Sequence, residues 1–273
     1  MGGEMSSYND NRVETALVTG ATRGIGWKFA KLLALRGYNL VITGRDQEQL
    51  DQFKTRYFAT GVAIRSMVAD LSSSEGAEGL LRWIKRQKIA IDILVNNAGF
   101  GDWGPFASCD SARQLAMIQV NVASLVQLTR ELLPDMLARG SGRILNVAST
   151  AAFSPGPLMA TYFATKAFVV SFSEALSKEV AGSGVTVTVL CPGATKTDFD
   201  RAAGLPERRI SGANVMDAEK VAVAGLDGLL AGKRIVIPGL TNRLGRFGAR
   251  LAPRSVILAF VHRFNAKKLP AKA

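Results

Sequence analysis

The chain has 273 residues, of which 48% are apolar, and carries a formal net charge of +12. This length suits one large α/β domain with a substantial buried core. The only histidine is His262, in the C-terminal tail, and the two cysteines, Cys109 and Cys191, lie far apart. These counts disfavour a Ser-His-Asp hydrolase, a histidine or zinc metal site and a disulfide framework, and they fit a reducing cytosol.

Residues 1–12 are polar and contain glycine, so we expect a flexible N-terminal arm without the apolar segment of a signal peptide. No stretch approaches the roughly 18–20 apolar residues that a membrane-spanning helix requires. The composition therefore predicts a cytoplasmic protein.

The first predicted strand, residues 13–19, runs into the glycine-rich turn Gly20-Ala-Thr-Arg-Gly24-Ile-Gly26, and an apolar helical pattern follows. Strand, glycine turn and helix in this order form a phosphate cradle. The glycines let the backbone approach a ligand, and the helix N-terminus offers free N–H groups. The spacing differs from the common Gly-x-Gly-x-x-Gly fingerprint, and an ordinary strand-to-helix turn is the alternative.

The second predicted strand, residues 39–43, is followed by Arg45 and Asp46. Sites that prefer NAD place a carboxylate near the ribose 2′-hydroxyl, whereas NADP sites place an arginine near the 2′-phosphate. Arginine binds phosphate through a planar fork, so Arg45 favours NADP(H). Asp46 disagrees with this choice unless it caps the helix that follows.

Further buried strands are indicated by apolar runs near residues 91–95, 144–147, 185–190 and 234–237, with a weaker one at 62–67. Helical patterns with charged faces separate these runs, as in a parallel sheet covered on both sides. We therefore predict an α/β fold for residues 13–240, a single doubly wound Rossmann-type domain with a seven-stranded parallel sheet. The strand at 91–95 closes on Asn96-Asn97-Ala98-Gly99. There Asn97 is placed to bridge neighbouring strands, and Gly99 would let a ring lie close to the backbone.

Tyr162 and Lys166 lie four residues apart in a predicted helix and therefore share one of its faces. A cation held near a phenol favours the phenolate and lowers its pKa. Such a tyrosine can exchange a proton with a substrate oxygen, which is general acid–base catalysis.

Together and in this order, the motifs Thr19-Gly20-x-x-x-Gly24-Ile25-Gly26, Asn96-Asn97-Ala98-Gly99 and Tyr162-x-x-x-Lys166 resemble the short-chain dehydrogenase/reductase family. The resemblance implies the strand order 3-2-1-4-5-6-7 and a catalytic set of Asn121, Ser149, Tyr162 and Lys166. Ser149 would orient the substrate carbonyl, and Asn121 would position a water that links Lys166 to solvent. The alternatives are a helix cap for Ser149 and backbone pairing in a bent helix for Asn121.

The resemblance also implies a set of NADP(H)-binding residues. Arg23 would be a second phosphate partner, Asp70 and Leu71 would border the adenine, and residues 192–197 would form the nicotinamide-side loop. For Asp70, a strand-end cap ahead of Ser72 is the alternative. The full set is Gly20, Thr22, Arg23, Gly24, Ile25, Gly26, Arg45, Asp70, Leu71, Asn97, Ala98, Gly99, Tyr162, Lys166, Pro192, Gly193, Thr195 and Thr197.

Bulky apolar residues beside these motifs suggest a lipophilic substrate if they line the site rather than the core: Phe100, Trp103, Phe153, Leu158 and Met159. By analogy, residues 198–216 would form the substrate loop. Its arginines, Arg201, Arg208 and Arg209, either meet an anionic group of the substrate or form a solvated face.

Residues 233–273 contain ten Lys or Arg and no Asp or Glu, with apolar residues interleaved. We expect residues 241–273 to form a basic amphipathic extension. It would lie on an anionic membrane, pack on a partner subunit or cover the substrate entrance. Nucleic-acid binding lacks a supporting motif. In this region the resemblance is looser and is to lipid-ketone and acyl-chain reductases.

The sequence thus predicts an NADP(H)-dependent oxidoreductase that transfers a hydride between nicotinamide and a carbonyl or secondary alcohol. The expected reaction is reduction of a lipophilic ketone, aldehyde or 3-oxoacyl group, and the family is commonly dimeric or tetrameric. A non-catalytic NADP(H) sensor acting through the basic tail is the alternative, although it would not need the catalytic set. Oxidation of a secondary alcohol with NAD is disfavoured by Arg45 and Arg23.

Overall fold

The computed structural model describes residues 12–204 and 215–266. The predicted arm lies outside these residues except for Arg12, whose guanidinium pairs with the Asp92 carboxylate at 2.7 Å.

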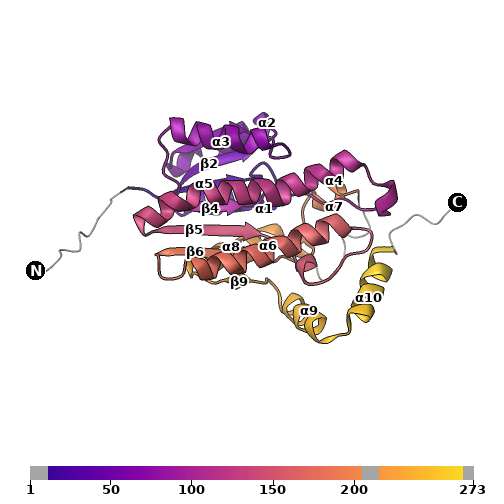
Figure 1. Cartoon of the computed structure of the whole chain (residues 1–273). Coiled ribbons are helices and arrows are strands. Elements are labelled where there is room, and N and C mark those ends of the chain that lie inside the picture. The colour runs from indigo at the N-terminus through magenta and orange to yellow at the C-terminus, as the bar shows by residue number, and fades with distance from the viewer. Residues whose placement is uncertain (1–11, 205–214, 267–273) are drawn as a thin grey trace, which may run out of the picture.

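Seven parallel strands form the central sheet in the order β3-β2-β1-β4-β5-β6-β9 (Figure 1), which confirms the predicted order. Every predicted strand is present, including the weaker third one. The strands are β1 (Thr15–Thr19), β2 (Asn39–Gly44), β3 (Ile64–Val68), β4 (Ile93–Asn96), β5 (Gly142–Val147), β6 (Val185–Leu190) and β9 (Ile235–Val236).

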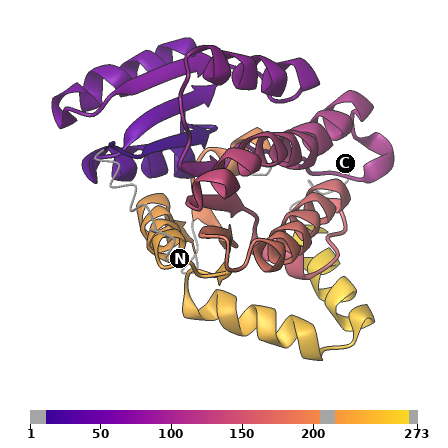
Figure 2. The ribbon, with the colours of Figure 1, turned by 60° about the vertical axis from the view of Figure 1, so that its left-hand side comes forward.

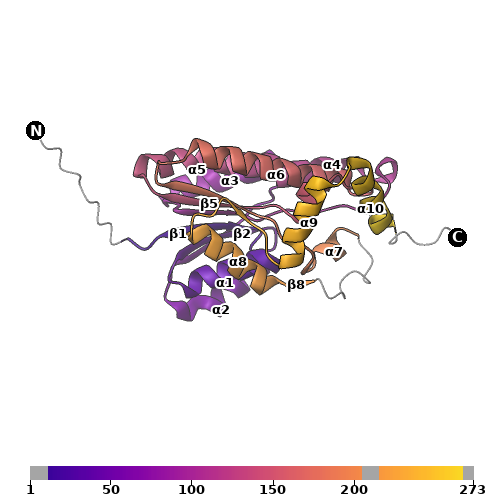
Figure 3. The ribbon, with the colours of Figure 1, turned by 90° about the horizontal axis from the view of Figure 1, so that it is seen from below.

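Helices cover both faces of the sheet (Figure 3). Alternate side chains of β1 divide between two cores, since Ala16 and Val18 face one core and Leu17 faces the other. The first core is closed by α1 (Gly24–Leu35), α2 (Gln47–Tyr57) and α8 (Ala218–Leu230). The second is closed by α3 (Ser74–Arg86), α5 (Ser124–Arg139) and α6 (Ala160–Glu179). The predicted doubly wound α/β fold is therefore confirmed.

The remaining elements are shorter or lie after the sheet. The helices are η1 (Phe58–Thr60), η2 (Phe106–Ser108), α4 (Ser111–Ile118), the π-helical turn η3 (Gln119–Ala123), η4 (Thr150–Phe153) and α7 (Phe199–Ala202), followed at the C-terminal end by α9 (Leu240–Leu251) and α10 (Arg254–Ala266). A separate two-stranded sheet pairs β7 (Thr195–Lys196) with β8 (Met216–Asp217). Within the described ranges, none of the helices is both long and apolar enough to cross a membrane.

Candidate active site

A cavity of about 490 Å³ lies at the carboxyl ends of the central strands. Its lining includes Gly20 after β1, Arg45 after β2, Gly99 after β4, Ser149 after β5 and Pro192 after β6. The strand order reverses between β1 and β4, and open α/β sheets bind their ligands in the crevice at such a point. Of the predicted catalytic and cofactor residues, all line this cavity except Gly26 and Asn121.

The glycine-rich turn needs its glycines for two different reasons. Gly20 and Gly24 have φ values of +64° and +57°, in the left-handed region that other residues rarely adopt. A Cβ on Gly26 would lie 2.2 Å from the Gly20 carbonyl oxygen. Gly26 therefore lets α1 pack closely against the turn, which explains why it does not line the cavity.

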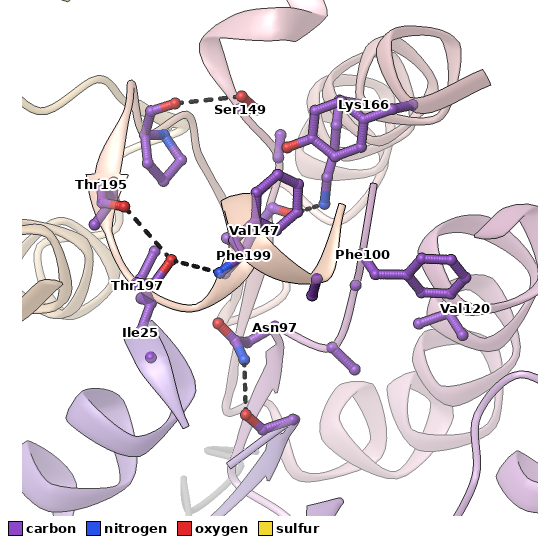
Figure 4. Close-up of a pocket in the computed structure, with 18 of the residues that line it drawn as sticks. Ile25, Asn97, Phe100, Val120, Val147, Ser149, Lys166, Thr195, Thr197 and Phe199 are labelled. Atoms are coloured by element: carbon purple, nitrogen blue, oxygen red, sulfur yellow. Dashed lines mark hydrogen bonds between the residues drawn. The ribbon is translucent and has the colours of Figure 1, made fainter. Parts of the chain in front are cut away.

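The predicted bridge by Asn97 is confirmed. Its amide nitrogen donates to the carbonyl oxygens of Thr19 at 2.9 Å and Gly20 at 3.2 Å (Figure 4). In return, the Thr19 hydroxyl accepts from the N–H groups of Asn97 and Ala98, each at 3.0 Å. These bonds join the loop after β4 to the glycine turn after β1.

One end of the cavity carries four charged side chains. Arg23 and Arg45 both line it, as do the two carboxylates Asp46 and Asp70. Asp46 caps α2 by accepting from the Gln49 N–H at 3.1 Å, and this confirms the capping alternative. The cap accounts for the presence of a carboxylate at this position, which lines the cavity together with Arg45.

Asp70 is held in a similar way, as the strand-end cap that was its alternative assignment. Its Oδ1 accepts from the Ser72 N–H at 3.0 Å and from the Ser72 hydroxyl at 2.8 Å. Burial acts to raise the pKa of Asp70, but the Ser72 hydrogen bonds and the nearby Arg45 charge hold it below its ordinary value.

The other end of the cavity carries the tyrosine–lysine pair of α6. Lys166 Nζ lies 5.8 Å from the centre of the Tyr162 ring and donates to the Val147 carbonyl oxygen at 2.9 Å (Figure 4). Both side chains are buried. Burial penalises the ammonium and lowers the pKa of Lys166 to about 8, which leaves it mainly protonated at neutral pH.

Ser149 both lines the cavity and caps a helix. Its hydroxyl oxygen accepts from the Ala151 N–H at 3.1 Å at the start of η4, and the hydroxyl donates to the Pro192 carbonyl at 3.4 Å (Figure 4). The helix-cap assignment is therefore correct, and it is compatible with a role toward a ligand.

Asn121 is fully buried in the π-helical turn η3, outside the cavity lining. Its side chain pairs with the backbone of Phe100 and with the Thr165 hydroxyl. The bent helix is present, but the backbone that Asn121 satisfies belongs to the loop after β4 and not to that helix; the water link to Lys166 stays a prediction.

The apolar wall of the cavity was predicted only in part. Phe100 and Met159 line it, whereas Trp103, Phe153 and Leu158 do not. Phe153 instead lies under the Arg246 guanidinium, 5.1 Å from its ring centre. Phe163, next to Tyr162 on α6, and Phe199, within the predicted substrate loop, also line the cavity, although neither was singled out. Val261, Phe264 and Asn265 were missed because they come from the distant helix α10.

The three loop arginines do not help to define the site. The Arg201 side chain is 75% exposed and lies 3.8 Å from the Asp198 carboxylate, as expected of a solvated face. Arg208 and Arg209 lie outside the described residues.

Residues 14–207 match the family described as short chain dehydrogenase. The chain belongs to this family. Ketoacyl reductase HetN of Nostoc is 34% identical over 180 residues, which cover 66% of this chain and 63% of HetN. The fold is similar to a short-chain dehydrogenase from Sphingobium yanoikuyae in complex with NADPH, with a TM-score of 0.79, 33% identity and coverage of 87% of this chain and 94% of that one. It is also similar to the bulky-bulky ketone specific alcohol dehydrogenase from Comamonas testosteroni, with a TM-score of 0.75, 30% identity and coverage of 96% and 97%.

Proposed function

We propose that this short-chain dehydrogenase is an NADP(H)-dependent oxidoreductase that reduces a lipophilic ketone, aldehyde or 3-oxoacyl group. The observation that carries the proposal is one continuous cavity with Arg23 and Arg45 at one end and Ser149, Tyr162 and Lys166 at the other. The two arginines suit a phosphate, and the other end of the cavity suits proton transfer.

The residues of the cavity fit a dinucleotide. A Cβ on Gly99 would lie 2.9 Å from Asn121 Oδ1 and 3.3 Å from Lys166 Nζ, and one on Gly20 would lie 2.9 Å from Ala98 Cα. These glycines therefore allow the loops after β1 and β4 to pack closely on their neighbours, and both loops line the cavity beside the first turn of α1, whose N–H groups suit a phosphate. Arg45 and Arg23 would hold the 2′-phosphate, and the NADPH bound by the Sphingobium relative supports that form.

NADPH, when bound, supplies a hydride to the carbonyl carbon. Tyr162 donates a proton to the carbonyl oxygen, and the positive charge of Lys166 favours the resulting phenolate. The Ser149 hydroxyl orients the same oxygen and stabilises the charge that develops on it. Lys166 is kept in place by its hydrogen bond to the Val147 carbonyl.

The substrate class is inferred from the apolar end of the cavity. Phe100, Met159, Phe163 and Phe199 contribute large apolar surfaces beside Tyr162, whose ring centre lies 5.3 Å from that of Phe199. A ketone with bulky apolar groups would fill such a space. The names of the Comamonas alcohol dehydrogenase and of HetN support this class.

The setting of the enzyme is part of the proposal. Residues 13–240 would form the catalytic domain and residues 241–273 an extension, with residues 1–12 as an arm. We expect a cytoplasmic homo-oligomer, a dimer or tetramer, whose C-terminal extension contacts a membrane surface.

The test is NADPH oxidation, compared with NADH oxidation, over a panel of aromatic, steroidal and 3-oxoacyl carbonyls. Tyr162→Phe is the matched variant, because it keeps the ring and removes only the proton donor. We expect turnover with NADPH to fall by roughly 10²–10⁴-fold in this variant while NADPH binding is retained. Tight NADPH binding without turnover of any carbonyl would favour the sensor, and full activity of Tyr162→Phe would refute the catalytic assignment.

A further inference from the structure

Helix α9 turns its apolar side chains away from the protein. Leu240, Leu244, Phe247 and Leu251 recur at helical spacing, and each is between 62% and 69% exposed. Such a stripe normally faces the core of a globular protein. Its exposure on an ordered helix marks a surface that binds something apolar.

Polar contacts hold the opposite side of α9 against the domain. The Asn242 amide donates to the Pro238 carbonyl at 2.7 Å, and Arg246 lies over the Phe153 ring. A Cβ on Gly193, in the loop that lines the cavity, would lie 2.5 Å from the Asn242 side-chain oxygen, so the two segments are in close contact. The orientation of α9 is therefore fixed by its neighbours, and its apolar stripe stays outward.

Helix α10 combines an exposed side with a side that lines the cavity. Val256 and Phe260 are 57% and 71% exposed. Val261 and Asn265 line the cavity, and the Asn265 amide donates to the Pro157 carbonyl at 2.8 Å. Figure 2 shows α9 and α10 as the outermost elements along one side of the molecule, with α10 rising toward the loops at the carboxyl ends of the strands.

The positive charge of these helices indicates what kind of partner they bind. Residues 233–266 contain Lys and Arg but no Asp or Glu. Arg243, Arg254 and Arg263 are exposed on α9 and α10, whereas Arg246 packs on Phe153. Exposed cations on helices that also carry an exposed apolar stripe complement an anionic bilayer, where the cations meet lipid headgroups and the apolar side chains enter the boundary of the acyl chains. A second copy across a twofold axis would bring the same cations face to face, which is unfavourable.

We propose that the α9–α10 surface, made of Leu240, Leu244, Phe247, Leu251, Val256 and Phe260, docks on an anionic bilayer and seats α10 between the lipid and the cavity. This docking proposal specifies the membrane contact named in the proposed function, and it rests on the proposed function for the identity of the substrate. A lipophilic carbonyl compound dissolved in the bilayer then reaches the cavity past α10 without crossing water.

The experiment is co-sedimentation of the full chain with vesicles of phosphatidylglycerol and phosphatidylcholine, or of phosphatidylcholine alone. We expect the protein to pellet with the anionic vesicles at low salt and to be released at high salt. The double variant Leu244→Asp, Phe247→Asp should bind the anionic vesicles with an affinity lower by roughly tenfold or more. It removes two apolar anchors and adds negative charge. The control is Phe58→Asp, at a side chain 83% exposed in η1, directly after α2.

A charge-reversal pair separates the electrostatic part of the binding. Arg254→Glu with Arg263→Glu should weaken pelleting, whereas Arg82→Glu with Arg86→Glu on α3 should leave it unchanged. Light scattering is measured on every variant. Loss of oligomer mass in Leu244→Asp, Phe247→Asp, without any pelleting of the wild type, would assign the surface to a second copy and overturn the proposal. Equal pelleting of all variants would overturn it as well.

Vesicle binding does not depend on catalysis, so the two proposals fail separately. Absence of NADPH turnover across the aromatic, steroidal and 3-oxoacyl panel, alongside anionic-vesicle binding, would reject the reductase and keep the docking surface. Turnover in solution without vesicle binding would keep the reductase and reject the docking surface.

Discussion

Asn121 and Phe100 form a closed pair of hydrogen bonds between a side-chain amide and a backbone unit. Asn121 Oδ1 accepts from the Phe100 N–H at 3.1 Å, and its Nδ2 donates to the Phe100 carbonyl at 3.0 Å. The same Nδ2 donates to the Thr165 hydroxyl at 3.0 Å, one residue before Lys166. One buried amide thus joins η3, the loop after β4 and α6.

Asn121→Ala is expected to loosen this junction. The backbone groups of Phe100 would lose their partners, and a buried polar group left without one costs about 1–3 kcal/mol. We expect the urea midpoint to fall, with NADPH turnover falling too because Gly99 and Lys166 are no longer held together. Asn121→Asp is the comparison: it keeps the acceptor for the Phe100 N–H but sets a buried carboxylate oxygen against the Phe100 carbonyl, so its urea midpoint should fall as well. An unchanged midpoint in Asn121→Ala would contradict the junction.

Arg45→Leu is expected to change the choice of cofactor. A hydrogen bond to a charged group contributes about 1.5–3 kcal/mol, so the variant should raise KM for NADPH by roughly 10–100-fold and leave KM for NADH nearly unchanged. Arg56→Leu, at an exposed position of α2 outside the cavity lining, is the matched control. Equal increases for both cofactors would mean that Arg45 does not select the 2′-phosphate.

Reduction should depend on pH through Lys166. Burial lowers its pKa from 10.5 to about 8, so the ammonium is present below that pH and is lost as the pH rises through it. We expect kcat/KM for NADPH, which reports groups of the free enzyme, to fall above pH 8 by about tenfold per unit. In Lys166→Met, kcat/KM should be low and should not change with pH over this range. A profile that is flat in the wild type would show that the charge of Lys166 is not required.

The same group affects stability with a definite sign. Because the folded pKa lies below the unfolded value, the cost of burying the ammonium is fully present below about pH 8. That cost is relieved as the pH rises from about 8 toward 10.5, where the unfolded chain still holds the proton. Urea unfolding across this range should therefore reveal a stabilising contribution in the wild type that Lys166→Met lacks.

The cofactor end of the site could be predicted because its residues belong to single strand–turn–helix units. The spacing of Gly20, Gly24 and Gly26 fixes a local conformation, and a parallel sheet brings the loops after its strands to one edge. Gly26 was predicted to bind cofactor, but its place in the structure is explained by packing of α1. A sequence motif identifies that a glycine is needed and leaves open which neighbour requires it.

The substrate end depends on contacts between distant segments. Asn265 reaches the Pro157 carbonyl across 108 residues, and Phe199 approaches Tyr162 from another loop. No periodicity encodes such contacts. Leu158 is adjacent to the cavity residue Met159 in sequence, yet its φ of +67° belongs to a turn and it does not line the cavity. Position along the chain therefore predicted this wall only in part.

Phe264 should limit the size of the substrate. Its side chain lines the cavity, and its ring stacks on that of Phe260 with 6.5 Å between centres. Phe264→Ala is expected to widen the substrate end and to raise kcat/KM for the bulkiest ketones relative to small ones by roughly tenfold, since each apolar group that gains or loses contact changes binding by about 1–3 kcal/mol.

Val256→Ala is the control for Phe264→Ala, because Val256 lies on the same helix, is exposed and does not line the cavity. Asn265→Leu tests the support of the same helix: it has similar volume but removes the donor to the Pro157 carbonyl, so α10 should close the cavity less well and KM for all ketones should rise. The panel is read as ratios of kcat/KM between large and small ketones, measured in solution without lipid. Identical ratios in wild type and Phe264→Ala would mean that α10 does not shape the substrate space.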